Sequence, residues 1–391
     1  MKIVFLSHPS FLPSQSMPRY INWLSQGMER LGHDVEVWSP KPKWYLIPAP
    51  GIIKKWLGYI DQYFLFPLYV RKRLASMPSN TLFVFSDQAL GPWVPIVKHR
   101  PHVIHCHDFL AQKSALGLIR ENPLSWTGKK YQNYIRKGYN SGKCFISVSA
   151  NTQKDLSSFL NKQPMISSIV YNGLNQPFAL SSNIAGTREL LTKEITIELT
   201  RGYILHVGGN QWYKNRDGLI EIYDAWRDMG GVLPLLLIGS TPNKKLLNTF
   251  NKSPYKNDIH FLTGKGDSFI IEAYRGASIL LFPSIAEGFG WPIAEAMASG
   301  CPVITTNEAP MTEVGSNAAF YIPVKPSSGD NSSWTIKAAE VVMNALNLSI
   351  DERNNVIEKG LSNIKRFNSE NSLKQIEAIY KDVVKMNFNL E

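Results

Sequence analysis

Short apolar runs alternate with longer helix-patterned stretches along almost the whole chain, and this alternation constrains the fold more than any other feature of the sequence. Runs of three to six apolar residues are typical of strands that a parallel sheet buries on both faces. Windows such as Tyr20–Leu31 and Asp217–Met229 have the spacing of helices. The order strand–helix–strand predicts parallel sheets covered by helices on both faces. The predicted strands are Ile3–Leu6, Val35–Trp38, Leu82–Phe85, Val103–His105, Cys144–Val148, Ile166–Tyr171, Ile204–Val207, Leu235–Ile238, Ile259–Leu262, Ile279–Phe282 and Val303–Thr305.

The chain has 391 residues, which is too long for one ordinary hydrophobic core and favours two domains. Polar sequence breaks the pattern between Phe178 and Arg201, after which Tyr203–Val207 opens a second alternating series. We therefore expect an α/β protein with two Rossmann-like, doubly wound domains, over residues 1–180 and 200–367, that face a central cleft where ligands bind. Residues 368–391 are expected to form a C-terminal helix that packs back toward the first domain.

Composition indicates a globular protein of the cytoplasm. Hydrophobic residues make up 44% of the chain and charged residues 19%. No apolar run approaches the roughly 18 residues that would span a bilayer, and the apolar start is too short for a signal peptide. The cysteines Cys106, Cys144 and Cys301 are scattered without a CxxC pair, which fits a reducing compartment and argues against a disulfide framework.

Positive charge is concentrated in the first half of the chain. Residues 1–180 carry 21 Lys and Arg against 8 Asp and Glu, a net charge of +13, whereas residues 181–391 carry a net charge of −2. A basic half attracts a polyanion such as nucleic acid, an anionic membrane face or a phosphorylated substrate, and also occurs for solubility alone. The stretch Lys54–Leu74 places aromatics between basic clusters. It predicts either an interfacial segment that faces lipid phosphates or a core helix pair with a basic end. A third interpretation is an apolar groove for the acceptor, which sequence does not separate from membrane contact.

The segment Pro283–Pro302 carries the clearest chemistry. It follows a predicted strand and precedes a predicted helix, and Gly288 and Gly290 let backbone N–H groups approach a ligand. A helix N-terminus favours anionic groups. Glu287 lies in the loop and Glu295 about one turn inside the helix, and a carboxylate can accept hydrogen bonds from two sugar hydroxyls. Together these residues predict a grip on both sugars and the diphosphate of a nucleotide-sugar.

This segment resembles the signature of glycosyltransferase family 4, retaining enzymes of the GT-B fold. The family has two glutamates separated by seven residues in an EGFGxPxxEAMAxGxPV-like run, which this chain matches from Glu287 to Val303. The resemblance implies that Glu287 lies against the donor hexose and that Glu295 binds the ribose hydroxyls. It also implies that the amides of Phe289 and Gly290 face the donor, with Gly288 in the same turn.

A second segment, His206–Asn215, resembles the family's VGxxxxRKN turn after the first strand of the second domain. By this resemblance Lys214 binds the donor diphosphate, where an ammonium group neutralises charge that grows on the leaving group. The chain departs from the family at Tyr213, where many members have arginine, and Arg216 is the candidate substitute. The other donor-binding candidates of this turn are Gly208, Gly209 and Asn215.

In the first domain, His102–Phe109 resembles the family's HxHD-type strand end. His107 is the better candidate for the cleft, and the resemblance implies that it approaches the reacting sugar and the acceptor. The alternatives are a core histidine or a metal ligand, although no third ligand has suitable spacing. The loop after the first strand lacks the family's Gly-Gly pair, and there Ser16 and Arg19 are candidate contacts for the acceptor or a phosphate.

The resemblance implies a retaining hexosyltransferase that uses a nucleotide-sugar donor and a glycan or lipid-linked acceptor, in the synthesis of a surface polysaccharide or lipopolysaccharide. No metal or other cofactor is expected, because the chain contains no DxD sequence that could bridge a metal to a diphosphate. A peripheral position on the inner face of an anionic membrane is the expected setting.

Other classes of function compete with this one. A nicotinamide oxidoreductase also has tandem α/β domains, but GxGxxG follows neither opening strand. Nucleic-acid binding lacks a recognised module. A non-catalytic nucleotide-sugar or carbohydrate-binding protein of the same fold remains the main alternative. The donor base and hexose, the acceptor and its linkage are not specified by these patterns.

Overall fold

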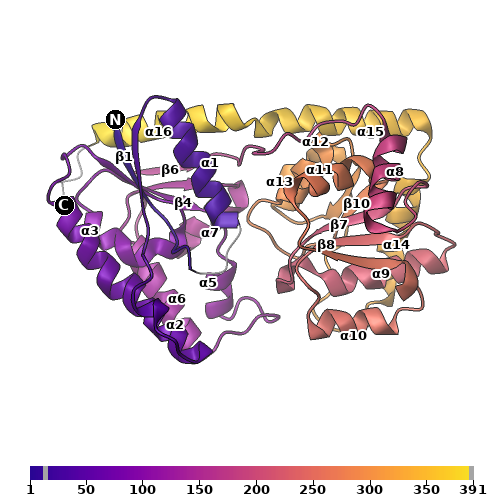
Figure 1. Ribbon diagram of the computed structural model, residues 1–391, viewed down its shortest axis with the longest axis horizontal. Coiled ribbons are helices and arrows are strands. Elements are labelled where there is room, and N and C mark those ends of the chain that lie inside the picture. The colour runs from indigo at the N-terminus through magenta and orange to yellow at the C-terminus, as the bar shows by residue number, and fades with distance from the viewer. Residues whose placement is uncertain (12–15, 387–391) are drawn as a thin grey trace. The chain divides into compact units, whose positions relative to one another are not determined.

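A computed structural model of the chain describes residues 1–11 and 16–386. The chain forms two compact units (Figure 1). The first comprises Met1–Gly173 together with the C-terminal stretch that begins at Ser369, and the second comprises Leu174–Asn368. Each unit contains one six-stranded parallel sheet with flanking helices, so the predicted pair of doubly wound α/β domains is confirmed.

The sheet of the first unit has the strand order β2-β1-β3-β4-β5-β6. Its strands are β1 Lys2–Leu6, β2 Asp34–Trp38, β3 Leu82–Phe85, β4 His102–Cys106, β5 Cys144–Ser147 and β6 Ile166–Ile169. Its helices are α1 Ser16–Arg30, α2 Gly51–Ile60, α3 Phe66–Leu74, α4 Val94–Val97, α5 Leu110–Ala115, α6 Trp126–Tyr139, α7 Ala150–Phe159 and α16 Ser369–Lys385.

The sheet of the second unit has the order β12-β11-β10-β7-β8-β9. Its strands are β7 Ile204–Gly208, β8 Leu235–Gly239, β9 Ile259–Thr263, β10 Ile279–Phe282, β11 Val303–Thr306 and β12 Ala319–Ile322. Its helices are α8 Ile184–Ile195, α9 Arg216–Asp228, α10 Lys244–Lys252, α11 Asp267–Gly276, α12 Trp291–Ala298, α13 Met311–Gly315, α14 Ser332–Leu346 and α15 Ile350–Asn363.

Alternate side chains of each strand in the first sheet enter two different cores, because successive residues of a strand point to opposite faces. Val4 and Phe83 pack with α3 and α6 on one face, while Ile3 and Val84 pack with α1 and α16 on the other. Both faces are covered, which explains why these strands read as continuous apolar runs in the sequence. Among the residues that the structure describes, no helix has an apolar stretch long enough to cross a membrane.

The last described helix, α16, completes the core of the first unit although it follows the whole second unit in sequence. Its residues Leu373, Ile376, Tyr380 and Val383 are buried against the first sheet and α1. The stretch between Phe178 and Arg201, where the sequence predicts a domain boundary, contains α8, which lies in the second unit and contacts α11.

His102 on β4 is fully buried, and both of its ring nitrogens are used. Nδ1 donates to the Arg100 carbonyl at 2.8 Å, and Nε2 accepts from the Lys143 N–H at 3.0 Å. A proton on Nε2 would replace this acceptor with a second donor. Burial, opposed in part by the bond to Arg100, lowers the pKa of His102 from 6.5 to about 4.

We expect this histidine to weaken the fold as the pH falls. Above pH 6.5 both folded and unfolded states hold it neutral, whereas between pH 6.5 and 4 the unfolded chain takes up a proton that the folded chain refuses. The free energy of unfolding should therefore fall by roughly 3 kcal/mol across this range on account of His102 alone. Urea unfolding at several pH values measures this change in the free energy of unfolding. The variant His102→Gln should make that free energy less dependent on pH, whereas the control His99→Gln, at an exposed position, should not. Parallel profiles for the wild type and His102→Gln would contradict the assignment.

Candidate active site

The strand order of the second sheet places two loops side by side at its carboxyl edge. From β7 the chain winds outward through β8 to β9, then returns to the other side of β7 as β10. The loops that follow β7 and β10 therefore leave the sheet in opposite directions from neighbouring strands. Ligands of open parallel sheets bind at such a switch point, outside the carboxyl ends of the strands.

An ion pair joins these two loops. Lys214, at the end of the short 3₁₀ turn Trp212–Lys214 after β7, donates from Nζ to Oε1 of Glu287 in the loop after β10, at 2.7 Å. Both side chains are largely buried, at 13% and 9% exposure. Backbone bonding also ties the loops together, since the Ile285 N–H donates to the Tyr213 carbonyl at 2.7 Å. The two side chains that the sequence assigns to the reacting sugar and the diphosphate thus lie in direct contact.

A side chain at position 208 would crowd the ring of His206 beside Lys214. A Cβ at position 208 would meet Nε2 of His206 at 3.1 Å and Cδ of Lys214 at 3.5 Å. His206 is buried beside this turn, its Nδ1 donates to the Leu281 carbonyl at 3.1 Å, and burial lowers its pKa to about 3. Its neutral ring places no second positive charge beside the ammonium group. At Gly209, a Cβ would meet the end of the Gln211 side chain.

The glycine turn ahead of α12 takes a conformation that only glycine adopts readily. Gly290 has a φ of +104° and is the N-cap of α12, with no side-chain cap. Phe289 beside it is buried, with its ring edge-on to Phe367 at 5.3 Å, which fixes the turn to the core. Gly288, which precedes it, is half-buried. The first turn of a helix carries N–H groups without partners inside the helix, so this turn can hold an anionic group.

Glu295 lies one turn inside α12 and is oriented by a tyrosine of α11. The hydroxyl of Tyr274 donates to Oε2 of Glu295 at 2.8 Å. Burial first, and the charge of Glu295 second, raise the pKa of Tyr274 well above its usual range, so the hydroxyl keeps its proton and remains a donor. This bond holds the carboxylate in one orientation.

Hydrogen bonds of the Asn215 and Arg216 side chains hold the turn after β7 in place. Asn215 has a φ of +50° and donates from Nδ2 to the Pro283 carbonyl of the opposite loop at 3.1 Å. Arg216 donates from Nη1 to Asn210 Oδ1 at 2.5 Å and to the Ser240 carbonyl at 3.0 Å. Burial lowers the pKa of Arg216 to about 10, which still leaves it charged at neutral pH. Both side chains stabilise the loops, and their contact with a donor remains a prediction.

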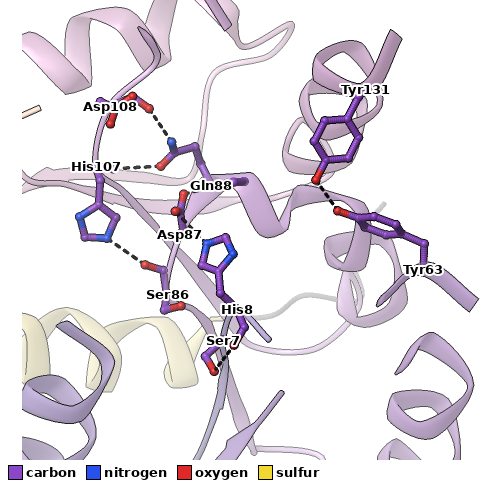
Figure 2. A network of polar contacts seen from close by, with 10 residues as sticks. Ser7, His8, Tyr63, Ser86, Asp87, Gln88, His107, Asp108 and Tyr131 are labelled. Atoms are coloured by element: carbon purple, nitrogen blue, oxygen red, sulfur yellow. Dashed lines mark hydrogen bonds and ion pairs between the residues drawn. The ribbon is translucent and has the colours of Figure 1, made fainter. Parts of the chain in front are cut away.

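The switch point of the first sheet holds a histidine–aspartate pair. His8 follows β1 and Asp87 follows β3, its neighbour, and His8 Nε2 lies 2.9 Å from Asp87 Oδ2 (Figure 2). Burial opposes ionisation of Asp87, but the hydrogen bond from His8 and the electrostatic interactions with His8 and His107 hold its pKa below the usual value. Asp87 also caps the following 3₁₀ turn by accepting from the Ala89 N–H at 2.8 Å.

His107 lies at the same edge, just beyond the end of β4. Its Nε2 donates to the Ser86 carbonyl at 2.9 Å, and its backbone N–H donates to Gln88 Oε1 at 2.9 Å (Figure 2). Burial lowers its pKa, although Asp87 and Ser86 act in the opposite sense. The ring of Tyr20 on α1 lies edge-on to it at 4.5 Å. These contacts fix a neutral imidazole with its proton on Nε2.

The remaining candidates of the first unit lie on α1. Arg19 is an exposed residue near the start of this helix. The backbone of Ser16 begins the helix, and its side chain lies outside the described residues. In the described part of the chain, no group of three or more His, Cys, Asp and Glu residues could hold a metal ion.

Sequence reasoning did not single out Tyr274, His8 or Asp87. For His8 and Asp87 a signal was available, because each is a titratable residue within two positions of the end of a predicted strand. Only the strand order makes them neighbours, however, and that order is a tertiary property. Tyr274 gives no comparable signal, since a tyrosine in a helix is ordinarily a core residue.

Two protein families match the chain in turn. Glycosyltransferase family 4 matches residues 17–176, and glycosyl transferases group 1 matches residues 187–357. Among curated proteins, the chain is 28% identical over 228 residues to the O-antigen chain mannosyltransferase RfbU of Salmonella typhimurium, covering 57% of this chain and 59% of that protein. It is 22% identical over 255 residues to the glycosyltransferase MJ1607 of Methanocaldococcus jannaschii, covering 60% and 65%. The chain thus spans less than two thirds of the length of either relative.

Solved structures share the fold over nearly the full chain. WaaG, a glycosyltransferase involved in lipopolysaccharide biosynthesis, superposes with a TM-score of 0.72 at 18% identity, covering 96% of this chain and 99% of that one. HepE from Anabaena, in complex with UDP and glucose, gives a TM-score of 0.70 at 16% identity and covers 97% and 98%. At such low identity these structures speak for the fold alone.

Proposed function

This chain belongs to the group 1 glycosyltransferases of family 4, and from that premise we propose that it transfers a hexose from a nucleotide-diphosphate sugar to a glycan or lipid-linked acceptor, with retention of the anomeric configuration. The donor occupies the second unit, at the switch point between β7 and β10. The acceptor belongs to the first unit, at the edge that carries His107.

The single observation that supports this proposal most is the Lys214–Glu287 pair. Two loops from different strands bring an ammonium group and a carboxylate within 2.7 Å of each other at the edge where parallel sheets bind ligands. A solvent-exposed ion pair contributes little to stability. This pair, in contrast, is largely buried and lies next to a glycine turn. A donor would give both groups a use, with its diphosphate at Lys214 and its hexose hydroxyls at Glu287.

The proposed reaction needs positioning and charge stabilisation rather than a protein nucleophile. The acceptor oxygen forms a bond to the anomeric carbon while the bond from that carbon to the diphosphate oxygen breaks. The acceptor proton passes to the departing diphosphate, whose growing charge Lys214 neutralises. Glu295, held by Tyr274, accepts hydrogen bonds from the ribose hydroxyls. On the first unit, Nδ1 of His107 carries no proton, so it can accept a hydrogen bond from the acceptor substrate.

The names of the relatives suggest the biosynthetic process to which such a reaction belongs. RfbU is named as an O-antigen mannosyltransferase and WaaG as a lipopolysaccharide glycosyltransferase. We propose the same setting, synthesis of a surface polysaccharide or lipopolysaccharide, for this chain. A net charge of +13 over residues 1–180 supports work at an anionic membrane surface, where lipid-linked acceptors are found.

We predict that the purified protein slowly hydrolyses one class of nucleotide-sugar, and that it does so equally well in EDTA. Thermal shift with UDP-, GDP- and ADP-sugars identifies the donor, and release of the nucleoside diphosphate measures turnover. The anomeric configuration of a transferred sugar is then read by NMR. Binding without any turnover would indicate a carbohydrate-binding protein instead, and loss of activity in EDTA that Mg²⁺ or Mn²⁺ restores would contradict metal independence.

A further inference from the structure

The segment from Trp44 to Tyr69 exposes an unusual amount of apolar surface. Helices α2 and α3 follow each other along the edge of the first unit, joined by the π-helical turn Asp61–Leu65 (Figure 1). In a surface helix the side turned away from the core is ordinarily charged or polar. Here that side carries large apolar side chains. The exposed apolar residues of the segment are Trp44, Leu46, Ile47, Ile52, Ile53, Trp56, Phe64, Leu68 and Tyr69, which we call the apolar face.

These residues form a stripe rather than a scatter. Positions 52, 56, 64 and 68 are spaced by multiples of four along one nearly continuous helix, and they are 78%, 59%, 64% and 49% exposed. A spacing of four drifts slowly around an α-helix of 3.6 residues per turn. The π-helical turn is wider and counteracts this drift, so the stripe continues from α2 into α3.

The opposite side of the same helix is firmly held by the first unit. Phe66 and Val70 are buried in its core. The Gln62 carbonyl accepts from Trp93 Nε1 at 3.0 Å, and the hydroxyls of Tyr63 and Tyr131 lie 2.6 Å apart (Figure 2). The apolar face is therefore presented by a fixed helix, and turning it inward would break these contacts.

The exposed charges of the sequence interval between Glu36 and Asp87 are positive, and of its cations Arg73 is paired with Glu36 at 2.7 Å. Seven Lys and Arg residues lie between Glu36 and Asp87, and Asp61 is the one acidic residue in that interval. Asp61 is only 1% exposed and accepts from the backbone N–H groups of Lys43, Trp44 and Tyr45 at 2.9–3.0 Å. These hydrogen bonds fix the loop that carries the apolar residues 44, 46 and 47. Among the exposed cations are Lys41, Lys43, Lys55, Arg71 and Lys72.

We propose that the apolar face docks on an anionic lipid bilayer, with its aromatic and aliphatic side chains inserted at the headgroup level and the surrounding cations on lipid phosphates. Tryptophan and tyrosine are favoured at that depth, and anionic headgroups attract basic residues placed around an apolar patch. A second copy of the chain is disfavoured as the occupant, because it would bring one set of unbalanced cations against another. This inference deepens the membrane setting of the proposed function by naming the surface, and it does not depend on the transfer reaction.

Co-sedimentation of the full chain with vesicles tests the proposal without any substrate. Vesicles of phosphatidylcholine with about one third phosphatidylglycerol should bind the protein, and phosphatidylcholine alone should bind it far more weakly. The double variant Trp56→Ser with Phe64→Ser should lower the vesicle partition coefficient roughly tenfold or more. The matched control is Leu190→Ser with Ile350→Ser, which removes two comparably exposed apolar side chains, 67% and 80%, from the second unit. This control should bind like the wild type.

The dependence of binding on salt separates the electrostatic contribution to vesicle binding from the contribution of the inserted apolar side chains. Raising the salt from about 0.1 M to about 1 M shortens the Debye length from about 10 Å to about 3 Å and should release most of the protein. Equal binding to both kinds of vesicle, or equal loss in the two double variants, would overturn the proposal. So would a concentration-dependent dimer in analytical ultracentrifugation that Trp56→Ser with Phe64→Ser abolishes while vesicles bind nothing. Nucleotide-sugar hydrolysis by the double variant should equal that of the wild type, so failure of docking and failure of the transferase function give different results.

Discussion

Replacing Lys214 by alanine is expected to lower kcat for nucleotide-sugar turnover roughly 10²–10³-fold, while the thermal unfolding temperature stays close to that of the wild type. The ammonium group would act on charge that develops as the diphosphate departs, so its loss affects the transition state more than the bound donor. Rates of nucleoside diphosphate release at saturating donor measure the effect.

The chain contains a matched control for this experiment. Lys325 and Glu221 form an ion pair of the same length, 2.7 Å, in the same unit, with the lysine 16% exposed. Lys325→Ala removes a comparable contact away from the switch point and should leave kcat nearly unchanged. The exchange Lys214→Glu with Glu287→Lys restores an ion pair but not the proposed roles, so it should stay inactive. Recovery of turnover in the exchanged variant, or equal effects of Lys214→Ala and Lys325→Ala, would show that the pair serves stability alone.

Gly239→Ala is expected to destabilise the second unit by about 4 kcal/mol, since it combines backbone strain with a steric overlap. Gly239 ends β8 beside Gly208 and has a φ of +147°. A Cβ there would lie 2.0 Å from the Gly208 carbonyl oxygen, a backbone atom that can move only with the turn that carries Lys214. Urea unfolding gives the change in the free energy of unfolding.

Two other glycines of the unit separate the strain from the overlap. Gly230 has a φ of +94° but open space around its missing Cβ, so Gly230→Ala should cost about 1 kcal/mol from strain alone. Gly266 has neither a positive φ nor a neighbour within 4 Å, so Gly266→Ala should be close to neutral. If Gly239→Ala lowered the free energy of unfolding no more than Gly230→Ala does, the close approach between the ends of β7 and β8 would not be needed for stability.

Local sequence was sufficient to predict most strands. Both faces of each parallel sheet are covered by helices, and this makes most of the strands apolar along their whole length. Each of the eleven predicted strands is present. The strand that was missed, Ala319–Ile322, lies at the edge of its sheet, and three of its four residues are only half-buried. Its edge position does not account for the miss, because the edge strands Asp34–Trp38, Ile166–Ile169 and Ile259–Thr263 were predicted.

The donor-side candidates illustrate what a motif can and cannot predict. The spacing of Glu287 and Glu295 and the position of Lys214 follow from local sequence, and the structure brings Lys214 and Glu287 into contact. The hydrogen bond from Tyr274 to Glu295 depends on how α11 packs against α12, and no local pattern encodes that packing. The segment Lys54–Leu74 fits neither sequence interpretation alone, because one side is core and the other is exposed and apolar.

The place of α16 has a consequence for the order in which the protein matures on the ribosome. Residues 1–173 of the first unit are translated before the second unit, and α16 is translated after it. Until Tyr380 emerges, His105 lacks one of its two hydroxyl partners, and the sheet face around Ile3 and Val84 lacks part of its cover. Domains generally fold in the order of synthesis. Here the second unit is translated between the two parts of the first, so the sheet around Ile3 and Val84 is completed only after the second unit has been made.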